Sequence, residues 1–152
     1  MAFKLIVNAF AEGAEIPSVY TCDGANISPS LEWSGEPAKT ASYALIMDDP
    51  DAPAGTWNHW LLYDIPASVH SLAQNFKPGG TGHSGANDFK KTGYGGPCPP
   101  KGHGAHRYYF RLYALDEKSL GLAAGAKRAE IDRAIHGHVL GETQYMGRYE
   151  RR

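Results

Sequence analysis

The sequence has no long apolar stretch and very few cysteines. The apolar run within residues 1–8 is too short for the hydrophobic region of a signal peptide, and no later run approaches the length of a membrane span. These absences favour a cytoplasmic protein without stable membrane insertion. Cys22 and Cys98 are the only two cysteines, and they form neither a CxxC motif nor a zinc pattern. We therefore expect both to be free thiols.

An excess of charge of one sign is also missing. The chain has 15 basic and 16 acidic side chains, which leave a formal net charge of −1. No uniform field exists to gather nucleic acid, so we expect no nucleic-acid partner. Glycine and proline are abundant, with 18 and 10 copies, and 42% of the 152 residues are hydrophobic. This composition is typical of one folded domain, residues 1–152, with many turns.

Short apolar or alternating runs recur between these turn residues. They predict six strands, at residues 3–10, 31–33, 43–48, 59–65, 107–115 and 142–149. Helical periodicity is clear only in residues 127–139, where Ile131, Ile135, His138 and Val139 share one face. The fold should thus be mainly β with a single clear late helix and few others, and His138 should be a hydrogen-bonded core histidine.

The segment at residues 76–106 is rich in glycine and proline and lacks apolar periodicity. A loop this long inside a compact domain is usually a binding or lid region. It contains a G-x-G-x-x-G match at residues 80–85, but no apolar strand precedes the match and no periodic helix follows it. Ser84 lacks the strand-turn-helix context of a nucleophile elbow. We expect no cofactor.

Two close histidine pairs raise the question of a metal. His103 with His106 and His136 with His138 are separated by glycines that suit a zinc-binding helix poorly, and no cysteine joins them. We therefore expect no metal site.

Three segments concentrate groups that can do chemistry. In the first, Pro50 and Pro53 stiffen a turn that presents the carboxylates of Asp49 and Asp51. The alternative is a solvated turn with local hydrogen bonds from its aspartates.

The second segment is an expected strand, residues 57–63, in which alternation places His59 on the same side as Trp57 and Leu61. A histidine on an apolar face needs a polar partner, and the Asp turn could supply one. The third segment, residues 95–108, is a proline-rich wall that leads into a strand. That strand should present His106 and Tyr108 on one face.

These segments together resemble the phosphatidylethanolamine-binding proteins, also called Raf kinase inhibitor-like proteins, and most closely their bacterial branch. Four motifs in the family's order and spacing carry the resemblance: Asp49-Pro50-Asp51-Ala52-Pro53, Trp57-Asn58-His59, Gly96-Pro97-Cys98-Pro99-Pro100-Lys101-Gly102 and His106-Arg107-Tyr108. It extends from the first predicted strand to Tyr149. Asn58 stands where many eukaryotic members have a second histidine.

The resemblance implies one domain of PEBP-like fold, built on two antiparallel sheets, with a small anion-binding pocket beside the Asp-Pro-Asp turn. It implies a pocket lined by Asp49, Asp51, His59, Pro99, Pro100, His106 and Tyr108, with Trp57 on the rim. The resemblance to the family also suggests a homodimer and protein partners.

We expect a non-enzymatic protein that binds a small anion such as phosphate or a phosphoethanolamine-like headgroup. His59 and His106 would donate hydrogen bonds, Tyr108 would offer its hydroxyl, and Asp49 or Asp51 would orient an imidazole. Because a carboxylate repels an anion, the ligand should carry a proton or an amine. Affinity should fall as the pH rises and the histidines deprotonate.

Two other classes of function remain open. A hydrolase or proton-transfer enzyme could use Asp49, His59 and His106, although no activated nucleophile adjoins a base in a recognised arrangement. Cys98 would then be either a reactive thiol or a small packed side chain. A protein-interaction scaffold would use exposed aromatic residues such as Trp33 and Tyr149 at a dimer face.

Overall fold

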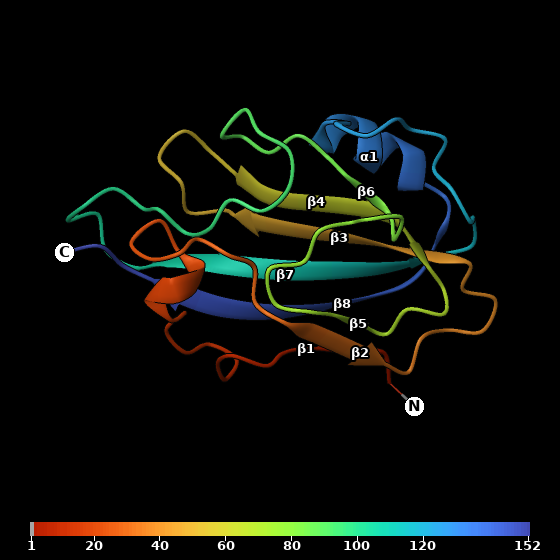
Figure 1. The fold of residues 1–152 in the computed structure, drawn as a ribbon, viewed down its shortest axis with the longest axis horizontal. Coiled ribbons are helices and arrows are strands. Elements are labelled where there is room, and N and C mark those ends of the chain that lie inside the picture. The colour runs from red at the N-terminus through yellow and green to blue at the C-terminus, as the bar shows by residue number, and fades with distance from the viewer. Residues whose placement is uncertain (1) are drawn as a thin grey trace.

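The computed structural model describes residues 2–152 and contains two antiparallel sheets (Figure 1). The smaller sheet has the order β1-β2-β5, with strands Lys4–Val7, Leu31–Ser34 and Ser71–Leu72. The larger sheet has the order β6-β4-β3-β7-β8, with strands His83–Ser84, Trp57–Pro66, Ser42–Asp49, His106–Leu115 and Val139–Tyr149. A short 3-10 helix, η1 (Ser18–Tyr20), and one α-helix, α1 (Arg128–Ile135), complete the described elements.

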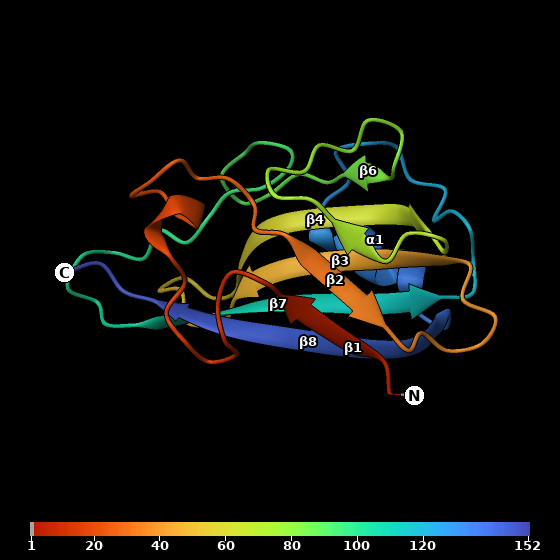
Figure 2. The same cartoon turned by 60° about the horizontal axis from the view of Figure 1, so that its bottom comes forward.

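The larger sheet is covered on both faces. The smaller sheet lies across one face and α1 lies behind the other (Figure 2). The layer between the sheets is filled by side chains such as Trp60, Phe110 and Leu112, whereas Ile46 and Leu61 pack toward Ile131 of α1. Central strand β3 is consequently buried along its whole length, which explains its almost continuous apolar sequence.

The mainly β fold with two antiparallel sheets and a late helix is confirmed. Each of the six predicted strands corresponds to an observed strand, with differences of a few residues at the ends. The two-residue strands β5 and β6 were not predicted, because a strand of that length has no periodicity of its own. β6 lies within the long loop at residues 76–106.

The helix is shorter than predicted, and the expectation for His138 is wrong. α1 ends at Ile135, and Gly137 then adopts a left-handed backbone conformation with φ of 84°. Ile131 and Ile135 are buried as predicted, but His138 lies beyond the helix and is partly exposed. Its Nδ1 lies 2.9 Å from Oδ1 of Asp116, so it is a surface histidine with a carboxylate partner.

The aromatic residues expected to be exposed are instead in the core. Trp33 and Tyr149 are only 4% and 7% exposed, so neither can supply a surface aromatic for a dimer face. Among residues 2–152, no helix has the length and hydropathy needed to cross a bilayer.

The prediction that the two cysteines are free is also wrong, because Cys22 and Cys98 form a disulfide. They are 76 positions apart in sequence, but the turn after η1 packs against the proline-rich segment. The backbone N–H of Cys22 donates to the carbonyl of Pro97 over 3.1 Å, and Asn26 Oδ1 accepts the N–H of Gly96 over 2.8 Å. Spacing along the chain carries no sign of this contact.

Removal of the disulfide should destabilise the protein. The double variant Cys22→Ser/Cys98→Ser should lose about 2–5 kcal/mol of unfolding free energy, because a long loop is no longer closed in the unfolded chain. Urea unfolding measures the loss, with reduced wild-type protein as the control. An unfolding midpoint that does not respond to reductant would contradict the cross-link.

Candidate functional site

A small cavity opens where β3 ends and where β4 and β7 begin. Its volume is about 180 Å³. The turn after β3 and the proline-rich segment before β7 form its sides. The lining residues are Asp49, Ala52, Pro53, Trp57, His59, Phe89, Cys98, Pro99, Pro100, His106 and Tyr108.

The structure brings seven of the eight proposed site residues to this cavity, and Asp51 is the exception. The Asp51 carboxylate accepts hydrogen bonds from Nε and Nη2 of Arg107, at 2.9 and 2.8 Å. The Arg107 guanidinium lowers the Asp51 pKa to about 2, mainly through these hydrogen bonds. The backbone N–H of Asp51 donates to Oδ1 of Asp49 over 2.8 Å. Asp51 therefore holds the turn to β7 beside the cavity.

Four lining residues were not proposed from the sequence: Ala52, Pro53, Phe89 and Cys98. Ala52, Pro53 and Cys98 lie within motifs that carried the family resemblance, and this position could have indicated that they line the cavity. Phe89 comes from the long loop predicted to be a binding region, and its ring packs edge-on against Trp57. Nothing in the local sequence distinguishes Phe89 from any other loop aromatic.

A β-bulge decides where His59 points. β3 pairs Met47 with Trp60 and Asp48 with Asn58, which leaves His59 as the extra residue. Trp57 and His59 both face the cavity as predicted, but Leu61 packs toward α1. The expectation that His59 and Leu61 share a side is therefore wrong, because the bulge interrupts the alternation between them.

His59 is a buried, neutral hydrogen-bond acceptor on its cavity side. Its ring packs edge-on against Phe89 and Tyr108, and its Nδ1 donates to the carbonyl of Gly95 over 2.6 Å. Burial lowers the pKa of His59, and the Gly95 hydrogen bond only partly opposes this effect. In the neutral ring with a proton on Nδ1, Nε2 has a free lone pair.

Asp49 and His106 form a buried pair across β3 and β7. Nδ1 of His106 donates to Oδ2 of Asp49 over 2.7 Å, and both side chains are at most 4% exposed. The expectation that one aspartate of the turn orients an imidazole is thus met by Asp49. Nε2 of His106 lies 2.7 Å from Nδ1 of His103. The sequence singled out His103 only as a possible metal ligand.

Two buried donors at the cavity lack acceptors. Within residues 2–152, neither the Tyr108 hydroxyl nor the Trp57 indole Nε1 has a hydrogen-bond partner. Burial raises the pKa of Tyr108, and the nearby Asp49 carboxylate raises it further by its negative charge and as an acceptor close to the hydroxyl, although no hydrogen bond of regular geometry joins the two. The phenol therefore keeps its proton at neutral pH and can donate it.

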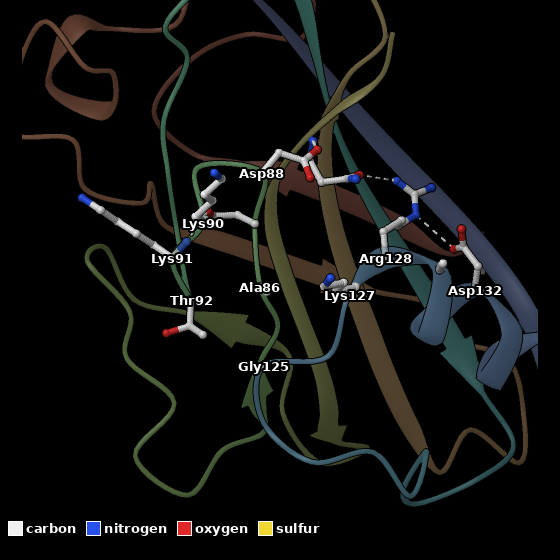
Figure 3. A pocket seen from close by; sticks show the side chains of 12 residues that line it. Ala86, Asp88, Lys90, Lys91, Thr92, Gly125, Lys127, Arg128 and Asp132 are labelled. Atoms are coloured by element: carbon white, nitrogen blue, oxygen red, sulfur yellow. Dashed lines mark hydrogen bonds and ion pairs between the residues drawn. The ribbon is translucent and has the colours of Figure 1, made fainter. Parts of the chain in front are cut away.

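A larger cavity of about 790 Å³ lies between the loop at residues 86–92 and the start of α1 (Figure 3). Its basic residues do not converge, because Lys91 points away from α1, and Arg128 is engaged by Asn58 and Asp132. Asn58 thus belongs to this other face of β4. In the described chain, no lining side chain here has a buried polar atom without a partner. The smaller cavity is the better candidate site.

Comparisons with known proteins agree on one family. The family model described as phosphatidylethanolamine-binding protein matches residues 7–150. A UPF0098 protein of Aquifex aeolicus is 49% identical over 151 residues, which cover 97% of this chain and 88% of that protein. LppC of Mycobacterium tuberculosis, which is named as a lipoprotein, is 43% identical over 141 residues, which cover 93% of this chain and 69% of that protein.

Solved structures show the same fold. The PEBP homolog CT736 of Chlamydia trachomatis superposes with a TM-score of 0.92 at 36% identity, and 99% of each chain is covered. YbcL of E. coli, described as a member of the mammalian PEBP family, gives a TM-score of 0.93 at 31% identity, again over 99% of each chain.

The ion pair between Arg107 and Asp51 should make the stability of the fold depend on pH. In Arg107→Gln, the pKa of Asp51 should rise from about 2 toward its ordinary value of 3.8. Because the folded-state pKa is the lower one, this carboxylate stabilises the fold above pH 3.8 and loses that contribution as the pH falls toward 2. Carboxyl NMR titration measures the shift. Arg152→Gln, which removes a partner of Glu150 instead, is the matched control and should leave Asp51 unchanged.

Proposed function

This chain belongs to the phosphatidylethanolamine-binding protein family, and from that premise we propose that it binds a small phosphoryl ligand carrying its own hydrogen-bond donor. The observation that carries the proposal is a pair of donors at one small cavity, the Tyr108 hydroxyl and the Trp57 indole N–H, that have no hydrogen-bond partner among residues 2–152. A buried polar group without a partner costs about 1–3 kcal/mol. An anionic oxygen that accepts from both groups would remove that cost.

The acceptors at the cavity specify the other half of the ligand. The lone pair on Nε2 of neutral His59 and the carboxylate of Asp49 both disfavour a fully deprotonated anion. They favour a P–OH group or an ammonium group, which can donate to them. This replaces the expectation that His59 donates to the ligand, because its only N–H is used by Gly95.

The size of the cavity limits the ligand to a headgroup. Pockets for drug-sized molecules usually measure about 300–1,000 Å³, whereas this one measures about 180 Å³. Phosphate or phosphoethanolamine suits that volume, and any acyl chains of a lipid would remain outside. The proposal therefore concerns the headgroup, whether it belongs to a lipid or is free in solution.

One observation favours an enzyme as the second candidate. Asp49, His106 and His103 form a hydrogen-bonded chain like that of a base oriented by a carboxylate. Among the lining residues, however, no serine, threonine or lysine adjoins this chain, and the Cys98 sulfur is in the disulfide. Binding without turnover is the proposal that fits better. Turnover of phosphoester or acyl substrates that is lost in His106→Ala would favour the enzyme.

Location and assembly are proposals too. The disulfide favours an oxidising compartment, or the cytoplasm of a thermophile, over an ordinary cytoplasm.

The proposal of a homodimer rests only on the resemblance to the family, since Trp33 and Tyr149 are buried. Sedimentation of the purified protein decides between a monomer and a dimer.

Tyr108→Phe should weaken binding of inorganic phosphate about tenfold, which corresponds to ~1.4 kcal/mol for one lost hydrogen bond. Unfolding free energy should stay the same or rise, because a buried hydroxyl without a partner is removed. Isothermal titration and urea unfolding measure the two quantities. Tyr113→Phe, on the other face of β7, is the matched control and should bind as wild type does. Equal affinities for both variants would remove the basis of the proposal.

Phosphate affinity should fall as the pH rises through neutrality, because H₂PO₄⁻ with two P–OH donors gives way to HPO₄²⁻ with one, whereas His59 and Asp49 each require a donor. Phosphoethanolamine keeps its ammonium group and should lose less affinity over the same range. Isothermal titration of both ligands from pH 6 to 8 tests the difference, with His59→Ala as the variant expected to bind weakly. Affinities indifferent to pH and to His59→Ala would be incompatible with this recognition.

A further inference from the structure

Both ring nitrogens of His106 are already occupied. Nδ1 donates to Asp49, and Nε2 lies 2.7 Å from Nδ1 of His103. Because the proton on Nδ1 of His106 serves the carboxylate, we assign Nε2 as the acceptor in this contact and Nδ1–H of His103 as its donor. A ligand that enters the cavity therefore meets a His106 whose free lone pair has been taken by another imidazole.

His103 lies in a turn between two glycines. It is exposed, unlike His106, and it does not line the cavity. Gly102 and Gly104 flank it with φ values of 75° and 89°, and a Cβ added at either glycine would meet nothing within 4 Å. The turn is held by two backbone hydrogen bonds, from His103 N–H to Pro100 and from Gly102 N–H to Arg151. The imidazole thus has open space around its turn and only one described side-chain hydrogen bond, to His106.

We infer that His103 is a positioning residue that stands in for the ligand's donor. In the free protein, its Nδ1–H satisfies Nε2 of His106. When a ligand binds, a P–OH or ammonium N–H of that ligand donates to Nε2 instead, and His103 turns out toward solvent. No proton is transferred in this exchange, because one N–H or O–H donor replaces another. The inference rests on the proposed function, and it adds His103 as a competitor of the ligand for Nε2 of His106.

The exchange predicts that removal of the His103 side chain raises the affinity for the ligand. Removal of a merely structural side chain beside a binding site should weaken binding, whereas removal of an internal competitor should strengthen it. His103→Ala should therefore bind inorganic phosphate several-fold more tightly than wild type. His103→Asn is the matched control, because its Nδ2 lies the same two bonds from Cβ as Nδ1 of histidine. It can still donate to His106 and should bind as wild type does.

A second measurement does not depend on any ligand. Diethyl pyrocarbonate reacts with an imidazole nitrogen that has a free lone pair, and peptide mapping by mass spectrometry locates the product. His106 should react slowly in wild type and in His103→Asn, and several-fold faster in His103→Ala.

The outcomes separate the two proposals. Tighter phosphate binding and faster His106 modification in His103→Ala together support the inference. Binding by wild type with equal or weaker binding by His103→Ala overturns the inference alone, as does unchanged His106 reactivity. Absence of phosphate binding by all three proteins overturns the proposed function, and the exchange with it.

Discussion

The hydrogen bond between the buried Asp49 carboxylate and the His106 imidazole is the contact on which the candidate site depends. It joins the end of β3 to the start of β7, and both side chains are almost inaccessible to solvent. Breaking one side of such a pair leaves an uncompensated polar group in a medium of low polarity, so the pair keeps the two strand ends in register. The Asp51 contacts with Arg107 and with Asp49 then hold the adjoining turn in place. These contacts join the strand ends and the turn around the cavity.

The walls of the cavity are held in place by contacts with a segment that is distant in the sequence. The disulfide and the backbone hydrogen bonds around Cys22 attach the proline-rich segment to the turn after η1, which belongs to a different part of the chain. With its walls held in this way, the cavity can keep the Tyr108 hydroxyl and the Trp57 indole N–H without a partner in the described part of the chain. Groups that would otherwise find each other by small rearrangements are instead kept available to a ligand, which is the usual structural basis of a preorganised binding site.

Prediction from sequence succeeded where one local rule governs a segment. The alternation at the start of β7 correctly places His106 and Tyr108 on the buried face and Arg107 outside, because the pairing with β8 is regular there and its irregularity comes only between Ala114 and Leu115. The same rule failed at His59, where one extra residue in β4 reverses the relation to Leu61. Helical periodicity identified Ile131 and Ile135 as core residues but extended too far toward His138, because it gives no weight to the left-handed glycine that follows the helix.

The sequence by itself determined the mainly β fold class, the family resemblance and most of the side chains that gather at the cavity, because these follow from local patterns and from motifs whose residues are close in the chain. Only the tertiary structure decided the Cys22–Cys98 cross-link, the separation of Asp51 from the cavity and the contact of His103 with His106. It also decided the protonation roles, because a histidine becomes donor or acceptor according to its burial and to the partner that takes its first nitrogen. Those partners are brought together by packing, and spacing along a chain does not encode them.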